Sequence, residues 1–403
     1  MKKIFDNLIF KLILAVCLGL VVGFNANEGA MNVIVTLKHI LGQVIFFAVP
    51  LIIIGFIAPS ISKLKNNASK FLGYTVSFAY LSSVGAAIFS MVAGYILIPK
   101  LSIESSVGSL RELPELLFQL DIPQVMPVMS ALFLSIIVGL AVTWTNADMF
   151  EKILDEFQNI VLSIVNRIVI PALPFFIATT FAALAYEGSI TNHLPVFLKV
   201  IAIVLVGHFI WITLLYTIGG IMSGKNPMEV LKHYGPAYLT AIGSMSSAAT
   251  LPVALSCAKK SKVLRKDILD FSIPLCANIH LCGSVLTEVF FVMVVSQILY
   301  GQLPSVSSMI LFVILLGVFA IGAPGVPGGT VMASLGLITS VLGFNETGTA
   351  LILTIFALQD SFGTDCNVLG DGAISLMLTG VANKKKVVRK KATQESMVKK
   401  QYI

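Results

Sequence analysis

Long apolar segments separated by short polar connections occupy most of the chain. A membrane-spanning helix needs about 20 predominantly apolar residues, and eight segments of this kind can be drawn along the sequence. They fall at residues 8–24, 36–61, 70–98, 125–146, 152–186, 195–222, 265–300 and 347–382. The pattern therefore predicts an all-α integral membrane protein whose chain crosses the bilayer eight times.

Two further apolar segments, 227–258 and 305–343, are interrupted by glycine, proline and serine. Lysine and arginine side chains favour the cytoplasmic side of a membrane. If the N-terminus is inside and the chain crosses eight times, the lysine- and arginine-rich connections and the basic C-terminal tail all lie on the cytoplasmic side. This holds only if each interrupted segment enters and leaves the membrane on the same side. We therefore predict two re-entrant hairpins, the first entering from the cytoplasm and the second from outside.

The two interrupted segments resemble each other at their tips. The first tip reads AIGSMSSAATLP and the second reads AIGAPGVPGGTVMA, and a long helix with polar residues in mid-span follows each. A hairpin followed by such a helix, repeated with opposite entry sides, predicts an inverted repeat. Repeats of this kind place a substrate and its coupling ions near the middle of the membrane, where backbone groups line a cavity.

The last predicted span carries polar side chains where a membrane helix normally has none. At about 100° per residue, four of them share one face within an arc of about 60°, with Gly363 beside them and Asp365 on the other side. The four residues, which we call the polar stripe, are Asp360, Thr364, Asn367 and Asp371. A carboxylate at the bilayer centre costs roughly 3 kcal/mol or more, so we interpret the polar stripe as a binding surface rather than as passive packing.

The preceding span contains PLCANIHLCGSVLTE, from Pro274 to Glu288, in which polar residues alternate with apolar ones. Alternation suits locally unwound backbone better than a continuous helix, and Gly283 would ease a break. Carbonyl groups released by such a break can ligate a cation together with Asp371. His280 lies in this segment, and an imidazole can exchange protons at physiological pH. The lone His208, by contrast, is predicted to be a packing residue.

Composition and charge agree with a membrane protein. The chain is 57% hydrophobic and 12% charged, with a mean hydropathy of +0.93, whereas a soluble protein carries about 25% charged residues. Much of its net charge of +7 lies in the membrane-flanking segments CAKKSKVLRKD and NKKKVVRKKATQESMVKKQYI. The charge therefore indicates cytoplasmic ends rather than a nucleic-acid partner. The five cysteines are expected to be mostly buried free thiols.

The tips SMSSAATLP and GVPGG, together with the run QDSFGTDCNVLGDG, resemble the dicarboxylate/amino acid:cation symporter family, the glutamate transporter homologues. The resemblance covers essentially the whole chain. It implies a homotrimeric elevator transporter in the cytoplasmic membrane, with both termini in the cytoplasm. It also implies a scaffold at residues 1–225, a transport core at 226–382 and a basic cytoplasmic tail at 383–403, with the third and sixth spans moving with the core.

The resemblance also implies a set of site residues. Asp360 would receive the amino group of a substrate, and Asn367 would receive its carboxylate. The remaining substrate positions are Met245, Ser247, Ser284, Val326, Gly363 and Thr364. A sodium site would comprise Asp371 and, partly through backbone carbonyls, Cys276, His280 and Asn367. Na+ is thus an expected coupling ion, and no organic cofactor is expected.

Several positions depart from the family's pattern. The family's Asn-Met-Asp-Gly-Thr reads HLCGS here, so His280 and Cys282 replace an asparagine and a sodium-binding aspartate, and a thiol is a poor ligand for a hard cation. Gly363 and Met245 replace arginines, the first of which binds an acidic side chain. These departures predict a preference for neutral amino acids over dicarboxylates. They also leave H+ as an alternative coupling ion, with His280 and Asp365 as candidate proton carriers.

Two other classes of function compete with a symporter. Cys276, His280 and Cys282 offer soft ligands, so a metal-binding or metal-transporting membrane protein is the main alternative, although their spacing matches no closed zinc motif. An enzyme is not expected, because no base is assignable to the serines of the first tip. No nucleotide-binding glycine pattern lies in a strand–turn–helix context either. The expected partners are a small-molecule substrate, membrane lipid and copies of the same chain, and not nucleic acid.

Overall fold

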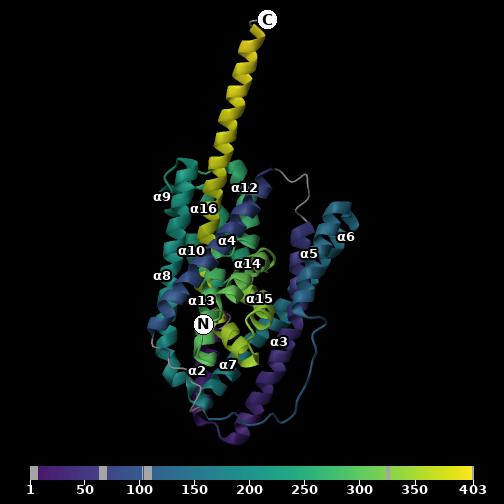
Figure 1. Ribbon diagram of the computed structural model, residues 1–403, viewed down its shortest axis with the longest axis vertical. Helices are drawn as coiled ribbons and strands as arrows, with labels where there is room; N and C mark the ends of the chain where they lie inside the picture. The colour runs from purple at the N-terminus through teal and green to yellow at the C-terminus, as the bar shows by residue number, and fades with distance from the viewer. Residues whose placement is uncertain (1–7, 63–69, 102, 104–110, 324–326, 402–403) are drawn as a thin grey trace.

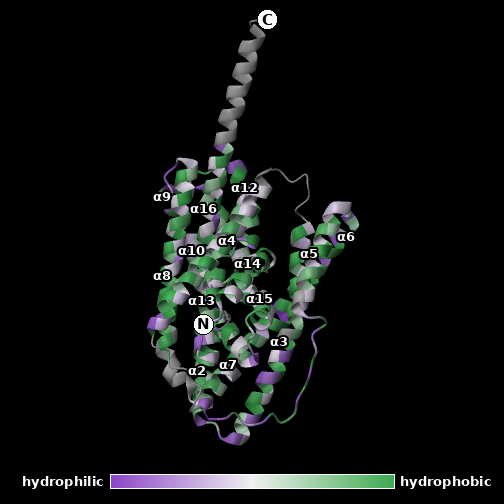
Figure 2. Ribbon diagram, viewed as in Figure 1, coloured by the Kyte–Doolittle hydropathy of each residue, from purple (hydrophilic) through white to green (hydrophobic). Residues whose placement is uncertain are grey.

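A computed structural model describes residues 8–62, 70–101, 103, 111–323 and 327–401 of the chain. Most of these residues are helical, and no strand occurs among them. The helices form one elongated bundle, and the last part of the C-terminal helix projects beyond it (Figure 1). Apolar residues dominate the bundle (Figure 2), as expected for helices that face lipid or one another.

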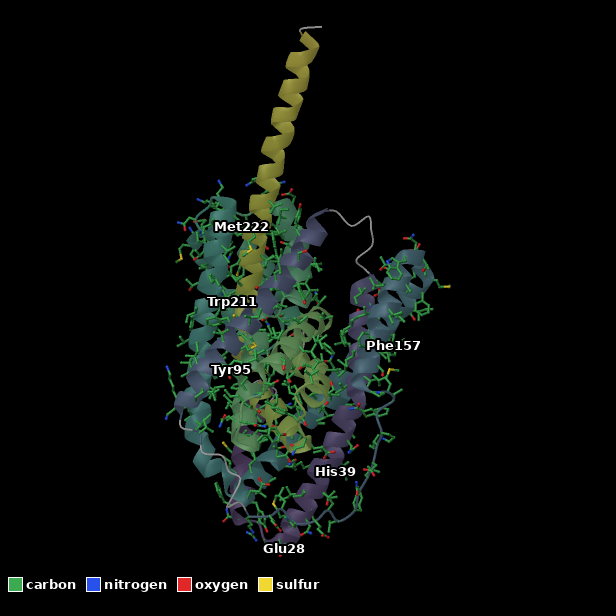
Figure 3. All side chains as sticks on the ribbon, in the orientation of Figure 1. Glu28, His39, Tyr95, Phe157, Trp211 and Met222 are labelled. Atoms are coloured by element: carbon green, nitrogen blue, oxygen red, sulfur yellow. The ribbon has the colours of Figure 1, made fainter. Side chains whose placement is uncertain are left out.

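The first half of the chain folds into long helices. They are α2 (Leu8–Asn25), α3 (Glu28–Ser62), α4 (Lys70–Leu97), α5 (Val128–Thr145), α6 (Asp148–Ile164), α7 (Ile170–Glu187) and α8 (Ser189–Ser223). A short 3-10 helix, Ile98–Leu101, extends α4, and a π-helical turn at Val165–Val169 joins α6 to α7. Glu28 lies at one end of the bundle and Met222 at the opposite end (Figure 3), so the long helices define its axis.

The second half of the chain combines short and long helices. It contains α9 (Met228–Leu231), α10 (Gly235–Ser244), α11 (Ser247–Lys259), α12 (Lys266–Ile279), α13 (Cys282–Tyr300), α14 (Val306–Gly322), α15 (Gly329–Ser340) and α16 (Glu346–Gln401). The helices of the pair α10–α11 pack against each other, and so do those of the pair α14–α15. We call these pairs the first and the second hairpin.

Local backbone chemistry ends the helices at the hairpin tips. Met245 has a left-handed backbone with a φ of 52°, which terminates α10. Ser246 then caps α11, because its side-chain oxygen accepts a hydrogen bond from the Ala249 amide at 3.1 Å. In the second hairpin Gly328 has a φ of 71°, which glycine adopts without strain, and α15 begins directly after it. Residues 324–326 lie outside the described part of the chain.

By length and composition, five helices among the described residues could cross a membrane. They are Glu28–Pro59, Gly73–Leu101, Asp148–Glu187, Leu198–Ser223 and Ser272–Tyr300, and they coincide with the second, third, fifth, sixth and seventh predicted spans. The first and fourth predicted spans contain shorter apolar helices, Phe10–Asn25 and Phe133–Thr145. The eighth corresponds to α16, whose apolar run carries three aspartates. The number of eight crossings therefore stays a prediction.

The basic segment after residue 382 is helical. The sequence predicts a basic tail at residues 383–403, and α16 continues through this segment to Gln401. This part of α16 leaves the bundle and extends past the neighbouring helices (Figure 1). Lysine and arginine are good helix formers, which accounts for the continuation of the helix into the basic segment.

Candidate substrate and ion site

The polar stripe of α16 lies in the interior of the bundle. The side chains of its four residues, Asp360, Thr364, Asn367 and Asp371, are each at most 4% exposed. α16 packs against α8, α10, α12, α13 and α15, so the stripe is surrounded by protein rather than by lipid. Its carboxylates and amide must find partners on these neighbours, because an unpaired polar group is costly inside a membrane.

Asp360 is paired with the backbone of the second hairpin. Its Oδ2 accepts a hydrogen bond from the Gly328 amide at 2.6 Å. Gly328 directly precedes α15, and the first N–H groups of a helix have no partner within that helix. Asp360 therefore caps α15 from the neighbouring helix, at an end where the helix dipole also favours negative charge.

Asn367 caps α13 in a similar way. Its Oδ1 accepts hydrogen bonds from the amides of Gly283 at 2.7 Å and Ser284 at 3.2 Å. Its Nδ2 donates to the Ser284 hydroxyl at 2.9 Å. The first turn of α13 thus engages both ends of the Asn367 side-chain amide, and Ser284 lies beside the stripe.

The break between α12 and α13 is confined to His280 and Leu281, and is shorter than the alternation of polar residues suggests. The His280 ring is fully buried. Its Nδ1 lies 3.0 Å from Oδ1 of Asp371, and its Nε2 lies 2.8 Å from the Ser82 hydroxyl on α4. The imidazole therefore pairs with the carboxylate for which the resemblance implies a sodium ion.

Thr364 and Asp365 occupy different sides of α16. The Thr364 hydroxyl interacts with the Asp360 carboxylate, within the stripe. The Asp365 carboxylate interacts with the Tyr238 hydroxyl on α10. Asp365 is therefore turned toward the first hairpin, and it is also buried, with 4% exposure.

The first hairpin supplies two of the predicted substrate positions. Met245 and Ser247 are buried at its tip, with exposures of 2% and 4%, and both helices of the hairpin pack against α16. The Ser244 hydroxyl accepts a hydrogen bond from the Ser246 amide at 3.3 Å, which holds the turn between the two helices. Val326, predicted in the second hairpin, lies outside the described residues.

Glycines allow α13 and α16 to approach each other closely. A Cβ on Gly363 would lie 3.2 Å from both Cα and Oγ of Ser284, so α13 packs directly against Gly363. A Cβ on Gly283 would lie 2.4 Å from Cβ of Cys366, far inside van der Waals contact. Gly283 therefore permits the approach that lets Asn367 reach the first turn of α13.

Gly283→Ala is expected to destabilise the protein, because the new methyl group would overlap Cys366 and the Gly363 carbonyl oxygen, which would lie 2.5 Å away. Overpacking a core costs roughly 1–3 kcal/mol and occasionally more. The melting temperature of the purified variant measures the effect. Gly243→Ala is the matched control, since a Cβ there would meet nothing within 4 Å. Equal melting temperatures for the two variants would contradict the close packing.

The buried cysteines make few polar contacts among the described residues. All five are free, and all but Cys17 are buried. The Cys276 carbonyl accepts a hydrogen bond from the His280 amide at 2.9 Å, and Sγ of Cys282 lies 3.8 Å from the Cys366 carbonyl oxygen. Within the described part of the chain, no three histidine, cysteine, aspartate or glutamate side chains are arranged to hold a metal ion. The geometry therefore gives no support to metal binding by these residues.

Two buried groups on or beside α13 also make polar contacts. Glu288, which the sequence analysis did not single out, accepts a hydrogen bond from the Ser334 hydroxyl on α15 through Oε1, while its Oε2 has no partner among the described residues. A lone acid within an apolar helix is the signal that could have identified it.

His208 makes two polar contacts with α13. Its Nε2 lies 2.9 Å from the Thr287 hydroxyl and 3.1 Å from the Gly283 carbonyl oxygen, so the ring links α8 to α13.

Comparison with known proteins adds independent information. A model of the sodium:dicarboxylate symporter family matches residues 8–381. Excitatory amino acid transporter 3 of Mus musculus is 33% identical over 151 residues, which are 38% of this chain and 28% of that protein. Excitatory amino acid transporter 1 of Ambystoma tigrinum is 28% identical over 230 residues, 56% of this chain and 40% of that protein. The chain thus spans less than half the length of these curated relatives.

Proposed function

This chain belongs to the sodium:dicarboxylate symporter family, and we propose that it is a secondary active symporter for amino acids, coupled to Na+ or H+. The family is one of transporters and not of enzymes. The buried polar stripe carries the proposal, because its groups meet the first turns of α13 and α15 inside a helical bundle. Polar and ionisable groups within a membrane mark substrate and ion pathways.

In this proposal Asp360 binds the ammonium group of the substrate, and Asn367 binds its carboxylate. The other lining positions are Met245, Ser247, Ser284, Val326, Gly363 and Thr364. Neutral amino acids are preferred, because none of these side chains is a cation that could pair with a second carboxylate. The Asn367 amide nitrogen, which donates to the Ser284 hydroxyl, would turn to the substrate carboxylate.

We further propose that the chain crosses the cytoplasmic membrane eight times, with two re-entrant hairpins, cytoplasmic termini and three copies in the assembly. Residues 226–382 would form a transport core that moves as an elevator, with α4 and α8, against a scaffold made by the rest of residues 1–225. The packing of α4 against α13 and of α8 against α16 supports this division, as does the packing of α2 against α7. The basic segment 383–403 would remain on the cytoplasmic side.

The coupling ion is proposed to be Na+ or H+, and different observations support each. The family's description supports sodium. However, His280 engages Asp371, and two backbone amides engage the side-chain oxygen of Asn367, so sodium would need His280 to move away. A protonated His280 would supply positive charge beside Asp371, which supports coupling to protons. Asp365 is the second candidate proton carrier.

Asp360→Asn is expected to reduce amino acid uptake into proteoliposomes strongly at low substrate concentrations, while the protein stays folded. The asparagine keeps an oxygen for the Gly328 amide but loses the charge that matches an ammonium group. Hydrogen bonds to charged groups contribute about 1.5–3 kcal/mol, so affinity should fall by roughly tenfold to a hundredfold. A thermal-shift screen of amino acids, with and without sodium, would first identify the substrate. Full uptake by the variant, with unchanged affinity, would remove Asp360 from the substrate site.

A further inference from the structure

A cavity of about 200 Å³ lies beside α3, and His39 on its wall lies toward the end of the bundle where Glu28 is found (Figure 3). Its walls come from α3, α7, the first turn of α16 and the extended residues that follow position 110. Glu346 lines it, whereas Asp360 of the polar stripe follows further along α16, about 20 Å away at 1.5 Å per residue. The cavity is therefore separate from the polar stripe.

The extended segment is attached to one face of α3 by a series of hydrogen bonds. Four polar side chains of α3, spaced four, three and four residues apart, share this face. Each of them contacts one backbone group of the segment at 2.9–3.3 Å, and the pairs are Asn32 with Glu115, Thr36 with Leu117, His39 with Leu120, and Gln43 with Ile122. The segment is thereby held as a wall, from which Leu113 and Leu116 line the cavity.

Two side chains of opposite charge line the cavity from different helices. Lys38 of α3 is half-buried, and its ammonium forms no ion pair with any described residue, although the carboxylates of Glu187 and Glu346 attract it. Glu346 begins α16, and its Oε2 lies 3.9 Å from Nδ1 of His39. With a neutral His39, the charges of the lining side chains sum to zero.

We propose that this cavity is a second binding site, which takes a zwitterionic amino acid. The ammonium of Lys38 receives the carboxylate of the ligand, and the carboxylate of Glu346 receives its amino group. Nε2 of His39 lies 3.1 Å from the Leu120 carbonyl oxygen, which can only accept, so a neutral imidazole presents Nδ1 as an acceptor beside Glu346. The amino group of the ligand then meets two acceptors.

Charge and size select this class of ligand. A simple anion would leave Glu346 unmatched and an amine would leave Lys38 unmatched, whereas a zwitterion pairs with both. The volume corresponds to about six or seven water molecules at roughly 30 Å³ each, which suits a small amino acid and excludes a peptide. Val35 and Phe176 supply apolar walls, so valine combines the charges and the side chain that fit best.

Equilibrium dialysis of labelled valine against the purified full-length protein tests the proposal. Binding is measured in the wild type and in Asp360→Asn, which weakens the site on the polar stripe. Adding Lys38→Met or Glu346→Gln to Asp360→Asn should lower the affinity for valine by about tenfold or more, because each change removes one charged partner. Glu28→Gln is the matched control on α3, and it should leave the affinity unchanged because Glu28 does not line the cavity.

Two analogues of valine provide a second measurement. Isobutylamine lacks the carboxylate of valine, and isovalerate lacks its amino group. In Asp360→Asn, each should displace labelled valine at least about tenfold more weakly than valine itself does, because each loses one charge-assisted contact. Equal displacement by valine and by either analogue would contradict recognition of a zwitterion and overturn the proposal.

The variants also distinguish this inference from the proposed function. If Lys38→Met fails to fold, Glu346→Gln decides, since the Glu346 side chain is 73% exposed and its replacement leaves the packing intact. Uptake by the wild type without valine binding in Asp360→Asn, or binding that neither variant weakens, keeps the symporter and removes the second site. Valine binding that depends on Lys38 and Glu346, without uptake of any amino acid, keeps the second site and removes the symporter.

Discussion

Replacing Asp371 with alanine is expected to lower the free energy of unfolding by about 3–5 kcal/mol, because it leaves a buried group without its partner. His280 and Asp371 are 0% and 1% exposed, and Nδ1 of the imidazole lies 3.0 Å from Oδ1 of the carboxylate. Uptake should be lost as well, since weakening an ion site weakens substrate binding reciprocally. Chemical unfolding and uptake into proteoliposomes measure the two effects. If stability, substrate affinity and cation dependence all survive, Asp371 is not part of a coupled ion site.

His280→Asn separates the two candidate coupling ions. The change removes the imidazole, frees the Asp371 carboxylate and places at this position the amide that the family's motif carries. Substrate binding is expected to depend on pH in the wild type, because an imidazole can gain or lose a proton, and to lose that dependence and become sodium-dependent in the variant. Calorimetric titration with substrate, with and without sodium at several pH values, provides the measurement. Sodium dependence that is the same in both proteins would assign coupling to another site.

The helices could be predicted from the sequence because the thickness of the hydrocarbon layer sets their length. The predicted span 70–98 corresponds to α4, and the interrupted segments 227–258 and 305–343 contain the two hairpins. The family predicted from the hairpin tips and the polar stripe is confirmed by the match to residues 8–381. The domain boundaries and the roles of the site residues stay predictions.

The partners of the stripe could not be predicted in the same way. Helical periodicity places Asp360, Asn367 and Asp371 on one face, but it contains no information about what packs against that face. The contact between His280 and Ser82 joins residues 198 positions apart. It depends on how closely α4, α13 and α16 pack together. The distance between α13 and α16 in turn depends on individual residues, such as Gly283, which has no Cβ. The same details explain why Gly363 faces α13 backbone instead of open space.

Substrate preference is expected to turn toward acidic amino acids when Gly363 is replaced by arginine. In the wild type, an acidic substrate would bury a second carboxylate near Asp360 and Asp371 with no cation to match it. An uncompensated buried charge costs several kcal/mol, and about 1.4 kcal/mol corresponds to a tenfold change in affinity. The wild type should therefore prefer neutral amino acids by at least tenfold, and the arginine should reduce or reverse that preference.

The packing of α13 sets the condition for Gly363→Arg. A Cβ at this position would lie 3.2 Å from Cα and Oγ of Ser284, so α13 must shift by a few tenths of an ångström and the melting temperature should fall. Gly363→Ala is the matched control, because it adds the same Cβ without the charge and should leave the preference unchanged.

Competition between a labelled neutral substrate and unlabelled aspartate, serine, alanine or threonine gives the preference directly. If aspartate competes best against the wild type, a basic group at some other position lines the pocket, because positions 245 and 363 carry methionine and glycine. If the arginine and alanine variants share one preference, position 363 does not determine selectivity.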